Sequence, residues 1–305
     1  MIYTLTLSPS VDLFISSEDF ELSKVNRYTK HEILPGGKGL NASVILTRHN
    51  FKNKAITLFD PNTFRQLAPI FEAEQLDIVN INTEQPTRIN IKYYGAKSNF
   101  ELNGPRTNIT EKLFKQVLNV ISTFKENDVL MLMGVSSEEH LVKILSLCKE
   151  KKVKVVLDVE SSNFLELLKY QPFVIKPNID ELKKIFPTIN FNETENLINA
   201  MRKLQNSGAL NVIVSLGKDG SYLLTQSQEI FVAENKETTS LVSATGAGDT
   251  LISIFAAEYL NNQNASYCLQ KASAAATGTV QSSWLGDQNL TNLAFELINL
   301  KKIKS

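Results

Sequence analysis

From about residue 110 onward, strand patterns and helix patterns alternate along the chain, and this alternation constrains the fold more than any other feature of the sequence. Residues 129–133, VLMLM, are apolar throughout, as a parallel strand buried on both faces should be. Similar strand patterns and amphipathic helical patterns take turns along this part of the chain. The strand patterns lie at 153–158, at 173–175 and from 211 onward, and the helical patterns lie at 110–124, 138–150 and 193–205. We therefore expect an α/β fold in which helices cover a mostly parallel central sheet.

The N-terminal part adds strands of this kind and also segments that look exposed. Strand patterns lie at 2–7, 55–59 and 78–81, and a helical pattern lies at 63–75. Residues 26–34 contain short alternating pieces, which we expect to be strands outside the parallel core. Residues 87–94 alternate at period 2, so Arg88, Asn90 and Lys92 share one face, which is either solvated or covers a site.

The C-terminal part contains two helical patterns, 251–261 and 267–280, which we expect to be the last elements of the chain. The second pattern carries small residues at 272–276. Small side chains there would let a flat group such as adenine, or simply a neighbouring helix, pack closely.

Composition and charge limit the possible partners. The 305 residues are 43% hydrophobic, which is ordinary for a globular protein with a full core. Lys plus Arg and Asp plus Glu number 32 each, and no basic stripe interleaved with aromatic residues is present, so we expect no nucleic-acid partner. Cys148 and Cys268 have no metal-binding or redox spacing. Because the sequence shows neither a signal peptide nor an apolar run of membrane-spanning length, we expect a soluble cytoplasmic protein without a membrane partner.

The stretch 243–250, SATGAGDT, predicts an anion-binding site beside a carboxylate. Gly246 and Gly248 allow backbone N–H groups to face outward, and the helix that follows adds the unpaired N–H groups of its first turn. Such a site would hold a phosphoryl group during transfer. Asp249 would stand at its edge, where it could take the proton of an attacking hydroxyl. The alternative is a glycine-rich turn in which Asp249 caps the helix.

The stretch 35–42, PGGKGLNA, opens a predicted helix that runs to about Arg48. Its glycines allow a ligand to approach the backbone, while Lys38 and Asn41 offer a charge and an amide. It is not a Walker A loop, because the spacing and the Lys-Ser/Thr pair are absent. A simple helix-capping turn is the alternative.

Three further carboxylates stand near predicted strand ends. Asp12 and Asp158 follow strands at the point where open α/β sheets bind ligands, although Asp12 could also be a surface turn residue. Asn178 and Glu181 begin a helix after the strand at 173–175. They could share a hydrated Mg²⁺, or they could form an ordinary helix cap.

Six motifs, in this order along nearly the whole chain, resemble those of the ribokinase-like (PfkB) carbohydrate kinases. Within that family the sequence is most similar to the sugar-phosphate kinases, namely 1-phosphofructokinase and tagatose-6-phosphate kinase. The motifs are the opening stretch 2–12, the GGKGLN of 36–41, the TRIN of 87–90, the KPN of 176–178 with Glu181, the VSLG of 214–217 with Gly220, and the GAGD of 246–249.

The resemblance implies a three-layer α/β kinase domain over residues 1–305 with a small β-sheet lid inserted from about 11–32 and 86–104. It also implies ATP as the donor, Mg²⁺ as a cofactor, possible use of a monovalent cation such as K⁺, and a homodimer in which the lids meet. By the same likeness Asp249 is the catalytic base, and Gly246, Ala247 and Gly248 form the anion hole. The resemblance assigns Asp12, Gly37 and Asn41 to sugar hydroxyls, Lys176, Asn178, Ser215, Gly217 and Gly220 to the nucleotide, and Glu181 with Asn178 to the metal, through water.

A phosphorylated acceptor requires fixed cations, and the sequence offers three. These are Lys38, Arg88 and Arg27, the last of which could reach from a partner subunit. We therefore expect a sugar-phosphate kinase, with fructose 1-phosphate favoured as the acceptor and fructose 1,6-bisphosphate as the product. Tagatose 6-phosphate, an unphosphorylated sugar or nucleoside, and a non-catalytic sensor remain alternatives. Loops at 59–63, 134–138 and 160–162 depart from the family pattern.

Overall fold

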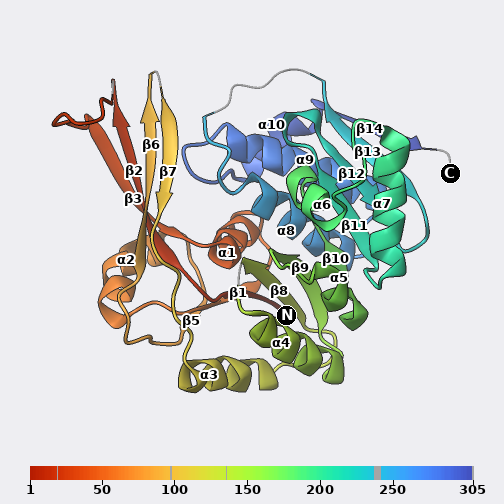
Figure 1. The fold of residues 1–305 in the computed structure, drawn as a ribbon, viewed down its shortest axis with the longest axis horizontal. Coiled ribbons are helices and arrows are strands. Elements are labelled where there is room, and N and C mark those ends of the chain that lie inside the picture. Colours follow the sequence, from red (N-terminus) through yellow and green to blue (C-terminus); the bar gives the residue numbers. More distant parts are fainter. Residues whose placement is uncertain (19, 97, 135, 237–241, 304–305) are drawn as a thin grey trace.

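The structure, a computed structural model, describes residues 1–18, 20–96, 98–134, 136–236 and 242–303. Helices lie on both faces of a large central sheet, and a second, smaller sheet projects from one end of the molecule (Figure 1). Across the described residues the large sheet has ten strands. In spatial order they are β14 (Ile298–Ile303), β13 (Ile230–Asn235), β12 (Ser221–Leu224), β11 (Asn211–Ser215), β10 (Val174–Ile175), β9 (Lys154–Val159), β8 (Val129–Gly134), β1 (Ile2–Thr6), β4 (Asn53–Thr57) and β5 (Ile78–Asn80).

Pairing in this sheet is parallel from β5 to β11 and antiparallel from β11 to β14. The prediction of a mostly parallel sheet is therefore confirmed. β8 is buried along nearly its whole length, which explains its apolar sequence. Because the parallel strands all end at one edge, the residues that follow them gather there.

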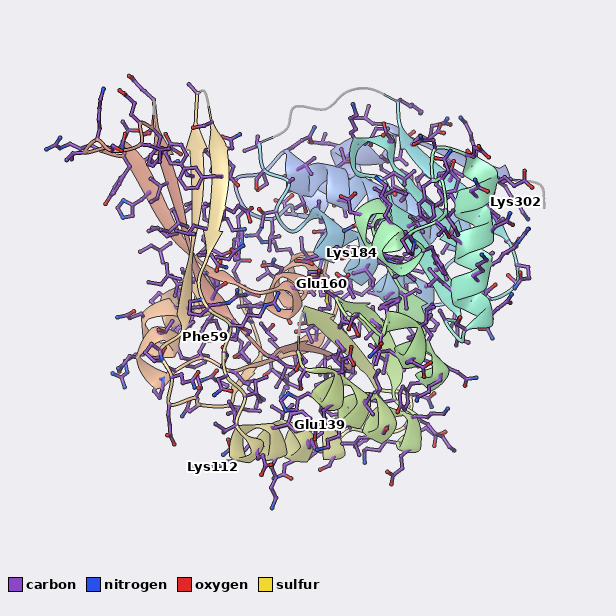
Figure 2. The ribbon with its side chains drawn as sticks, viewed as in Figure 1. Phe59, Lys112, Glu139, Glu160, Lys184 and Lys302 are labelled. Atoms are coloured by element: carbon purple, nitrogen blue, oxygen red, sulfur yellow. The ribbon has the colours of Figure 1, made fainter. Side chains whose placement is uncertain are left out.

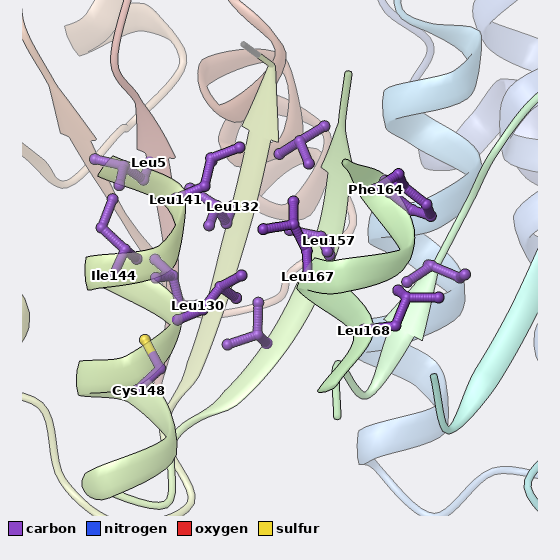
Figure 3. Packing of buried hydrophobic residues seen from close by; sticks show 14 of the residues in the cluster. Leu5, Leu130, Leu132, Leu141, Ile144, Cys148, Leu157, Phe164, Leu167 and Leu168 are labelled. Atoms are coloured by element: carbon purple, nitrogen blue, oxygen red, sulfur yellow. The ribbon is translucent and has the colours of Figure 1, made fainter. Parts of the chain in front are cut away.

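One face of the sheet carries helices from the middle of the chain. They are α3 (Glu111–Ser122), α4 (Glu138–Glu150), α5 (Phe164–Leu167), α6 (Ile179–Ile185) and α7 (Thr194–Asn206), with a short 3₁₀ turn at Leu168–Tyr170. A continuous apolar core fills this side, in which Leu141, Ile144 and Cys148 of α4 pack on Leu130 and Leu132 of β8 (Figure 3). The short helix α5 has no counterpart in the sequence-based expectation.

The other face carries α1 (Lys38–Arg48), α8 (Ala247–Leu260), α9 (Ala265–Val280) and α10 (Gln288–Phe295). α8 is buried on nearly every side, since it packs between the sheet, α1 and α9. α2 (Pro61–Ala73) packs with its Leu67 and Phe71 on Ala55 of β4 and on Phe59, which follows that strand. The expectation that the helix ending at Val280 closes the chain is wrong, because α10 and β14 follow it.

The smaller sheet contains β3 (Lys30–Gly36), β2 (Ser10–Ser17), β6 (Arg88–Gly95) and β7 (Asn99–Asn103), in that spatial order. β2 pairs with β6 in parallel, and the outer pairs are antiparallel. The alternation of side chains gives this sheet two different faces. One face is polar and looks toward the body of the protein, whereas the other is apolar and exposed, with Ile33, Ile89 and Leu102 at 48%, 55% and 62% accessibility.

Asp12 is not a surface turn residue, because it lies within β2 and is buried. Positions 19 and 97 of the two predicted lid segments, and residues 237–241 before the glycine-rich stretch, lie outside the described residues. In the described part of the chain, no helix combines the length and the apolar character that a membrane crossing needs.

Candidate active site

Asp249 lies in the first turn of α8, but it does not cap that helix. Gly246 occupies the N-cap position with a φ of 81°, a left-handed conformation that favours glycine. A Cβ at Gly246 would also lie 2.4 Å from Cδ2 of Leu285. The tight turn therefore needs glycine, and it brings the start of α8, where helix N–H groups lack carbonyl partners from a preceding turn, to the position where an anion could bind.

The carboxylate of Asp249 is buried, with only 6% of the residue exposed. Asn41 Nδ2, from the first turn of α1, donates a hydrogen bond to Asp249 Oδ2 at 2.9 Å. Burial raises the pKa of Asp249 above its ordinary value, and the negative charge of Asp158 adds to this rise, although Lys38 opposes it. A buried carboxylate with a raised pKa and one oriented oxygen has the properties of a general base.

Two lysines pair with the buried carboxylate of Asp158 beside the anion site. Lys38 Nζ lies 3.1 Å from Asp158 Oδ2, and Lys176 Nζ lies 3.6 Å from Asp158 Oδ1. Burial alone would raise the pKa of Asp158, but the two lysines hold it below its ordinary value. Lys176 Nζ would also lie 3.1 Å from a Cβ at Gly248, so its positive charge stands directly at the first turn of α8.

Asp12 and Asn90 form a second polar group on the inward face of the smaller sheet. Asp12 Oδ1 accepts hydrogen bonds from Ser10 Oγ at 2.7 Å and from Asn90 Nδ2 at 2.9 Å. Gly36 makes room for this carboxylate, because a Cβ there would lie 2.3 Å from Asp12 Oδ1. The group presents oriented acceptors and amides, which suit the hydroxyls of a sugar.

Arg88 and Lys92 add positive charge to the same face. Arg88 Nη2 donates to the carbonyl of Ser8 at 3.1 Å, whereas the buried Nε of Arg88 has no hydrogen-bond partner among the described residues. Burial lowers the pKa of Arg88 from its ordinary value. Lys92 is buried and lies 3.5 Å from Asp12 Oδ2. The face shared by Arg88, Asn90 and Lys92 therefore lines a cavity, and the alternative of a solvated face is wrong.

A third group of residues, between β11, β12 and α9, presents backbone and small side chains to the same cavity as the two polar groups above. Gly217 and Gly220, at φ values of 61° and 95°, shape the turn between β11 and β12. Ser221, Ser273 and Thr277 face the cavity from β12 and α9. These small groups leave room for a flat ring, and the turn glycines allow phosphates to approach the backbone.

A single cavity joins these three groups, and it collects almost every predicted site residue. It is lined by Asp12, Gly37, Lys38, Asn41, Arg88, Lys176, Asn178, Glu181, Ser215, Gly217, Gly220, Gly246, Ala247, Gly248 and Asp249. Arg27 is exposed in the connection between β2 and β3 and lies outside the described lining of this cavity. Sequence reasoning did not assign Lys92 or Asp158 to the site, although the period-2 pattern around Lys92 and the strand end at Asp158 were both visible.

Comparison with known proteins identifies the family. The profile of the pfkB family carbohydrate kinases matches residues 6–292. The chain belongs to the pfkB family. The predicted resemblance to the ribokinase-like carbohydrate kinases is therefore confirmed.

Individual relatives agree with this assignment. The chain is 34% identical to the 1-phosphofructokinase of Bacillus subtilis (strain 168), over 84% of this chain and 85% of that enzyme. It is 27% identical to the D-tagatose-1-phosphate kinase of Klebsiella oxytoca, over 99% of this chain and 100% of that enzyme. The fold matches that of phosphofructokinase-2 from Escherichia coli, with a TM-score of 0.91 at 21% identity over 97% of this chain and 98% of that one.

The residues present fit the ATP that a pfkB kinase uses. Lys176 and the first turn of α8 supply positive charge for a phosphoryl group, and the glycine turn at 217–220 opens toward the same space. Ala276 and Thr277 line the far end, where a base could pack. The predicted use of 272–276 as a surface for a flat group is compatible with this placement.

Asn178 and Glu181 form a reciprocal cap at the start of α6. Asn178 Oδ1 accepts from the backbone N–H groups of Asp180 and Glu181, and Glu181 Oε2 accepts from the N–H of Asn178, all at 2.9 Å. Within the described residues no group of three His, Cys, Asp or Glu side chains could hold a metal ion. A Mg²⁺ at this end would therefore depend on Glu181, water and the phosphates of the donor, which is a common arrangement for this ion.

Two of the three loops that depart from the family pattern contact each other. Glu138 accepts hydrogen bonds from Ser162 Oγ at 2.8 Å and from Asn163 Nδ2 at 2.6 Å. Glu160 pairs with Lys184 of α6 at 2.8 Å, and the two labelled side chains lie near the centre of the molecule in Figure 2. Glu138 of one loop therefore has a partner in the other loop, Ser162, and Glu160 has one in α6.

The third unusual loop, 59–63, supports the strand that carries Arg88. Asp60 caps α2 and also accepts from the N–H and the hydroxyl of Thr87, at 2.9 and 2.7 Å. Although burial raises the pKa of Asp60, hydrogen bonds from Thr63 and Thr87 hold it well below its ordinary value. An ionised Asp60 therefore fixes the start of β6.

Proposed function

We propose that this protein transfers the γ-phosphoryl group of ATP to a hydroxyl of a sugar phosphate, with fructose 1-phosphate as the acceptor and fructose 1,6-bisphosphate as the product. One observation carries the proposal. The general-base candidate Asp249, beside an anion site, shares a cavity with a hydroxyl-binding group and with the half-buried Arg88, whose buried Nε has no hydrogen-bond partner among the described residues.

Arg88 is the best-placed cation for the phosphate of the acceptor. Its unpaired Nε can donate a charge-assisted hydrogen bond, and its fork geometry suits a phosphate. Lys38, by contrast, is already paired with Asp158 beside the anion site. We therefore assign Lys38 to the transferred phosphoryl group as well as to the acceptor, and we keep Arg27 as a residue that a partner subunit would have to supply.

The choice of acceptor rests on the relatives. One is named 1-phosphofructokinase and another, which matches nearly the whole chain, is named D-tagatose-1-phosphate kinase. Fructose and tagatose differ only in configuration at one carbon, so the polar group around Asp12 and Asn90 would have to discriminate between them. Tagatose 1-phosphate is accordingly the second candidate acceptor, ahead of tagatose 6-phosphate.

The proposed mechanism divides the work among the described groups. Asp12 and Asn90 orient the acceptor, and Asp249 takes the proton of the attacking hydroxyl. The first turn of α8 and Lys176 hold the negative charge that develops on the transferring phosphoryl group. Mg²⁺, where bound, would neutralise charge on the donor phosphates near Glu181. The smaller sheet acts as a lid that excludes water.

The exposed apolar face of this sheet also supports the proposed homodimer. Ile33, Ile89 and Leu102 lie together on it, with roughly half of each residue exposed. Burying such a surface against a second copy would remove apolar area from water. We propose that two copies meet through these faces.

A coupled ADP-release assay tests the function. Mg·ATP would be combined separately with fructose 1-phosphate, tagatose 1-phosphate, tagatose 6-phosphate, fructose 6-phosphate, fructose, ribose and adenosine. We expect one 1-phosphorylated ketose to give the highest kcat/KM. A preference for an unphosphorylated compound would contradict the role of Arg88, and ATP binding without turnover on any acceptor would favour a non-catalytic sensor.

A further inference from the structure

Strand β6 contacts the loop that leads into the anion site through two side chains. Lys92 Nζ donates a hydrogen bond to Thr245 Oγ1 at 3.1 Å. The hydroxyls of Tyr94 and Ser243 lie 3.1 Å apart. Lys92 and Tyr94 are two residues apart on one strand, so both project from the face that carries Arg88 and Asn90.

Lys92 also belongs to the acceptor side of the cavity. Its ammonium group is 3.5 Å from Asp12 Oδ2 and 3.6 Å from Glu101 Oε1, and only 5% of the residue is exposed. A buried ammonium group is costly unless it is paired and hydrogen-bonded. The observed partners therefore tie Lys92 at the same time to the smaller sheet and to Thr245.

The contacted segment, residues 242–245, leads directly into the anion site. Val242 N and Ser243 N donate to the carbonyl of Val280 at 2.8 and 3.2 Å, which anchors the loop to the end of α9. Thr245 N donates to Ser243 Oγ at 3.2 Å, so the two residues touched by β6 are also joined to each other. Gly246, the N-cap of α8, follows immediately.

We propose that Lys92 and Tyr94 are positioning residues that fix the anion site relative to the acceptor. The inference rests on the proposed function and deepens it, because it concerns how the two reacting groups are aligned. Asp12 is carried by the smaller sheet, whereas Asp249 and the anion site are carried by α8 of the large domain. Displacing one reacting group by about 1 Å can cost about a hundredfold in rate, so a direct link between these two parts matters.

The double variant Tyr94→Phe/Thr245→Val tests the link without touching Asp12. It removes the Tyr94 hydroxyl that contacts Ser243 and the Thr245 hydroxyl that contacts both Lys92 and Glu101, and it leaves the ion pair between Lys92 and Asp12 intact. We expect kcat to fall about 10- to 100-fold, while the KM values for the acceptor and for ATP stay within about twofold, since both binding groups remain. The double variant Tyr94→Phe/Thr245→Ser should have a higher kcat than Tyr94→Phe/Thr245→Val, because serine returns the hydroxyl that Lys92 contacts.

Tyr93→Phe is the matched control. Tyr93 is the next residue on β6, but its hydroxyl lies 2.5 Å from Ser17 Oγ on the opposite face of the sheet. We expect Tyr93→Phe to keep the wild-type kcat. A double variant with the same kcat as Tyr93→Phe would overturn the proposal, and so would an unchanged kcat with a raised acceptor KM, which would indicate substrate contact instead.

Amide hydrogen exchange of residues 243–248 supplies a readout that does not depend on turnover. We expect faster exchange there in the double variant than in Tyr93→Phe. Equal exchange in the two variants would overturn the link. If the wild type phosphorylates no acceptor, the proposed function fails, but the exchange comparison still decides whether β6 holds this loop.

Discussion

Asp249 combines burial, a raised pKa and a fixed orientation, three properties that an exposed carboxylate rarely has together. It is buried, its pKa is raised mainly by that burial, and Asn41 orients one of its oxygens. Lys38 and Asp158 act on the same group with opposite signs, so the ionisation of Asp249 depends on charges that the fold fixes. The reactivity of this residue therefore depends on side chains of α1 and β9 as well as on its own buried position on α8.

Replacing Asp249 by Asn should remove the base and keep the shape of the site. We expect kcat to fall on the order of 10²–10⁴. Acceptor and ATP affinities, measured by calorimetry, should change little, because the groups that bind them are elsewhere in the cavity. An Asp249→Asn enzyme with the wild-type kcat would remove Asp249 from its catalytic role.

Lys38→Met should shift the pH dependence of the reaction. The base must be ionised, so activity falls as the pH drops through the pKa of Asp249. Lys38 lowers that pKa against the effect of burial, and its loss should move the acidic limb of kcat/KM to higher pH. Lys184→Met, a lysine that pairs with Glu160, is the control and should leave the limb in place. An unshifted limb in Lys38→Met would contradict the electrostatic argument.

Arg88→Ala should damage acceptor binding selectively. The loss of one charge-assisted contact, about 1.5–3 kcal/mol, corresponds to a roughly 10- to 150-fold rise in the acceptor KM. The KM for ATP should not change. Arg65→Ala, at an exposed arginine of α2, controls for the general loss of a positive charge. An acceptor KM equal to that of the control would count against a phosphorylated acceptor.

The order and type of most helices and strands could be predicted from sequence, because hydrophobic period and length agree in each. α4 is the clearest case, since its predicted range, 138–150, is also its observed range. α5 and β14 were missed for different reasons. α5 has only four residues, too few to show a period, and β14 carries Lys301 and Lys302 in the middle of its pattern.

Candidate site residues within local sequence motifs could be predicted, whereas those brought together only by the fold could not. The glycine-rich stretches and their polar neighbours are local in sequence, so Asp249, Lys38 and Asn41 could be chosen as candidates, and the structure places all three in one cavity. Lys92 could not be chosen in this way, because its role depends on Asp12 and Thr245, which are distant in sequence and meet only through pairing of β6 with β2 and docking on the loop before α8. A period-2 pattern shows which residues share a face, but not what that face meets.

The start of α8 offers a test of how closely helix geometry and activity are coupled. Gly246→Ala imposes a left-handed conformation on a residue with a Cβ, at a cost of about 1–2 kcal/mol, and pushes that Cβ against Leu285. Gly134→Ala is matched for strain, because Gly134 has a φ of 98° and a Cβ added there would meet no atom of the described residues within 4 Å. We expect both variants to lose stability in denaturant unfolding, but only Gly246→Ala to lose kcat. Equal kcat in the two variants would separate the turn from catalysis.

The molecule presents a markedly apolar outer surface on the smaller sheet. That surface lies opposite the face that covers the cavity, so the same four strands serve the site on one side and, in the proposed dimer, a second copy on the other. Pairing of two such sheets would also hold each at a fixed orientation over its own cavity. Assembly and catalysis would then share one structural element.

Ile89→Asp should break the proposed dimer. A charge in the centre of the apolar face could not be buried without a partner, so we expect the mass measured by light scattering to fall to that of one chain. Leu293→Asp on α10 is the control, since Leu293 is 74% exposed on a different surface and should leave the mass unchanged. A wild-type protein that is monomeric at micromolar concentration would contradict the proposal directly.

β14 forms one edge of the large sheet and so bears on how readily the protein aggregates. It pairs along the whole of β13, whose Ile230, Phe231 and Val232 are buried, and its Lys301 and Lys302 pair with Glu234 and Glu229 (Figure 2 labels Lys302). Charged lysines on an edge strand discourage edge-to-edge association between sheets. Ending the chain before Ile298 would remove β14 and expose β13, an apolar strand, as the edge of the sheet. We expect such a truncated protein to aggregate more readily. We therefore expect β14 to protect this edge of the sheet from association with other chains.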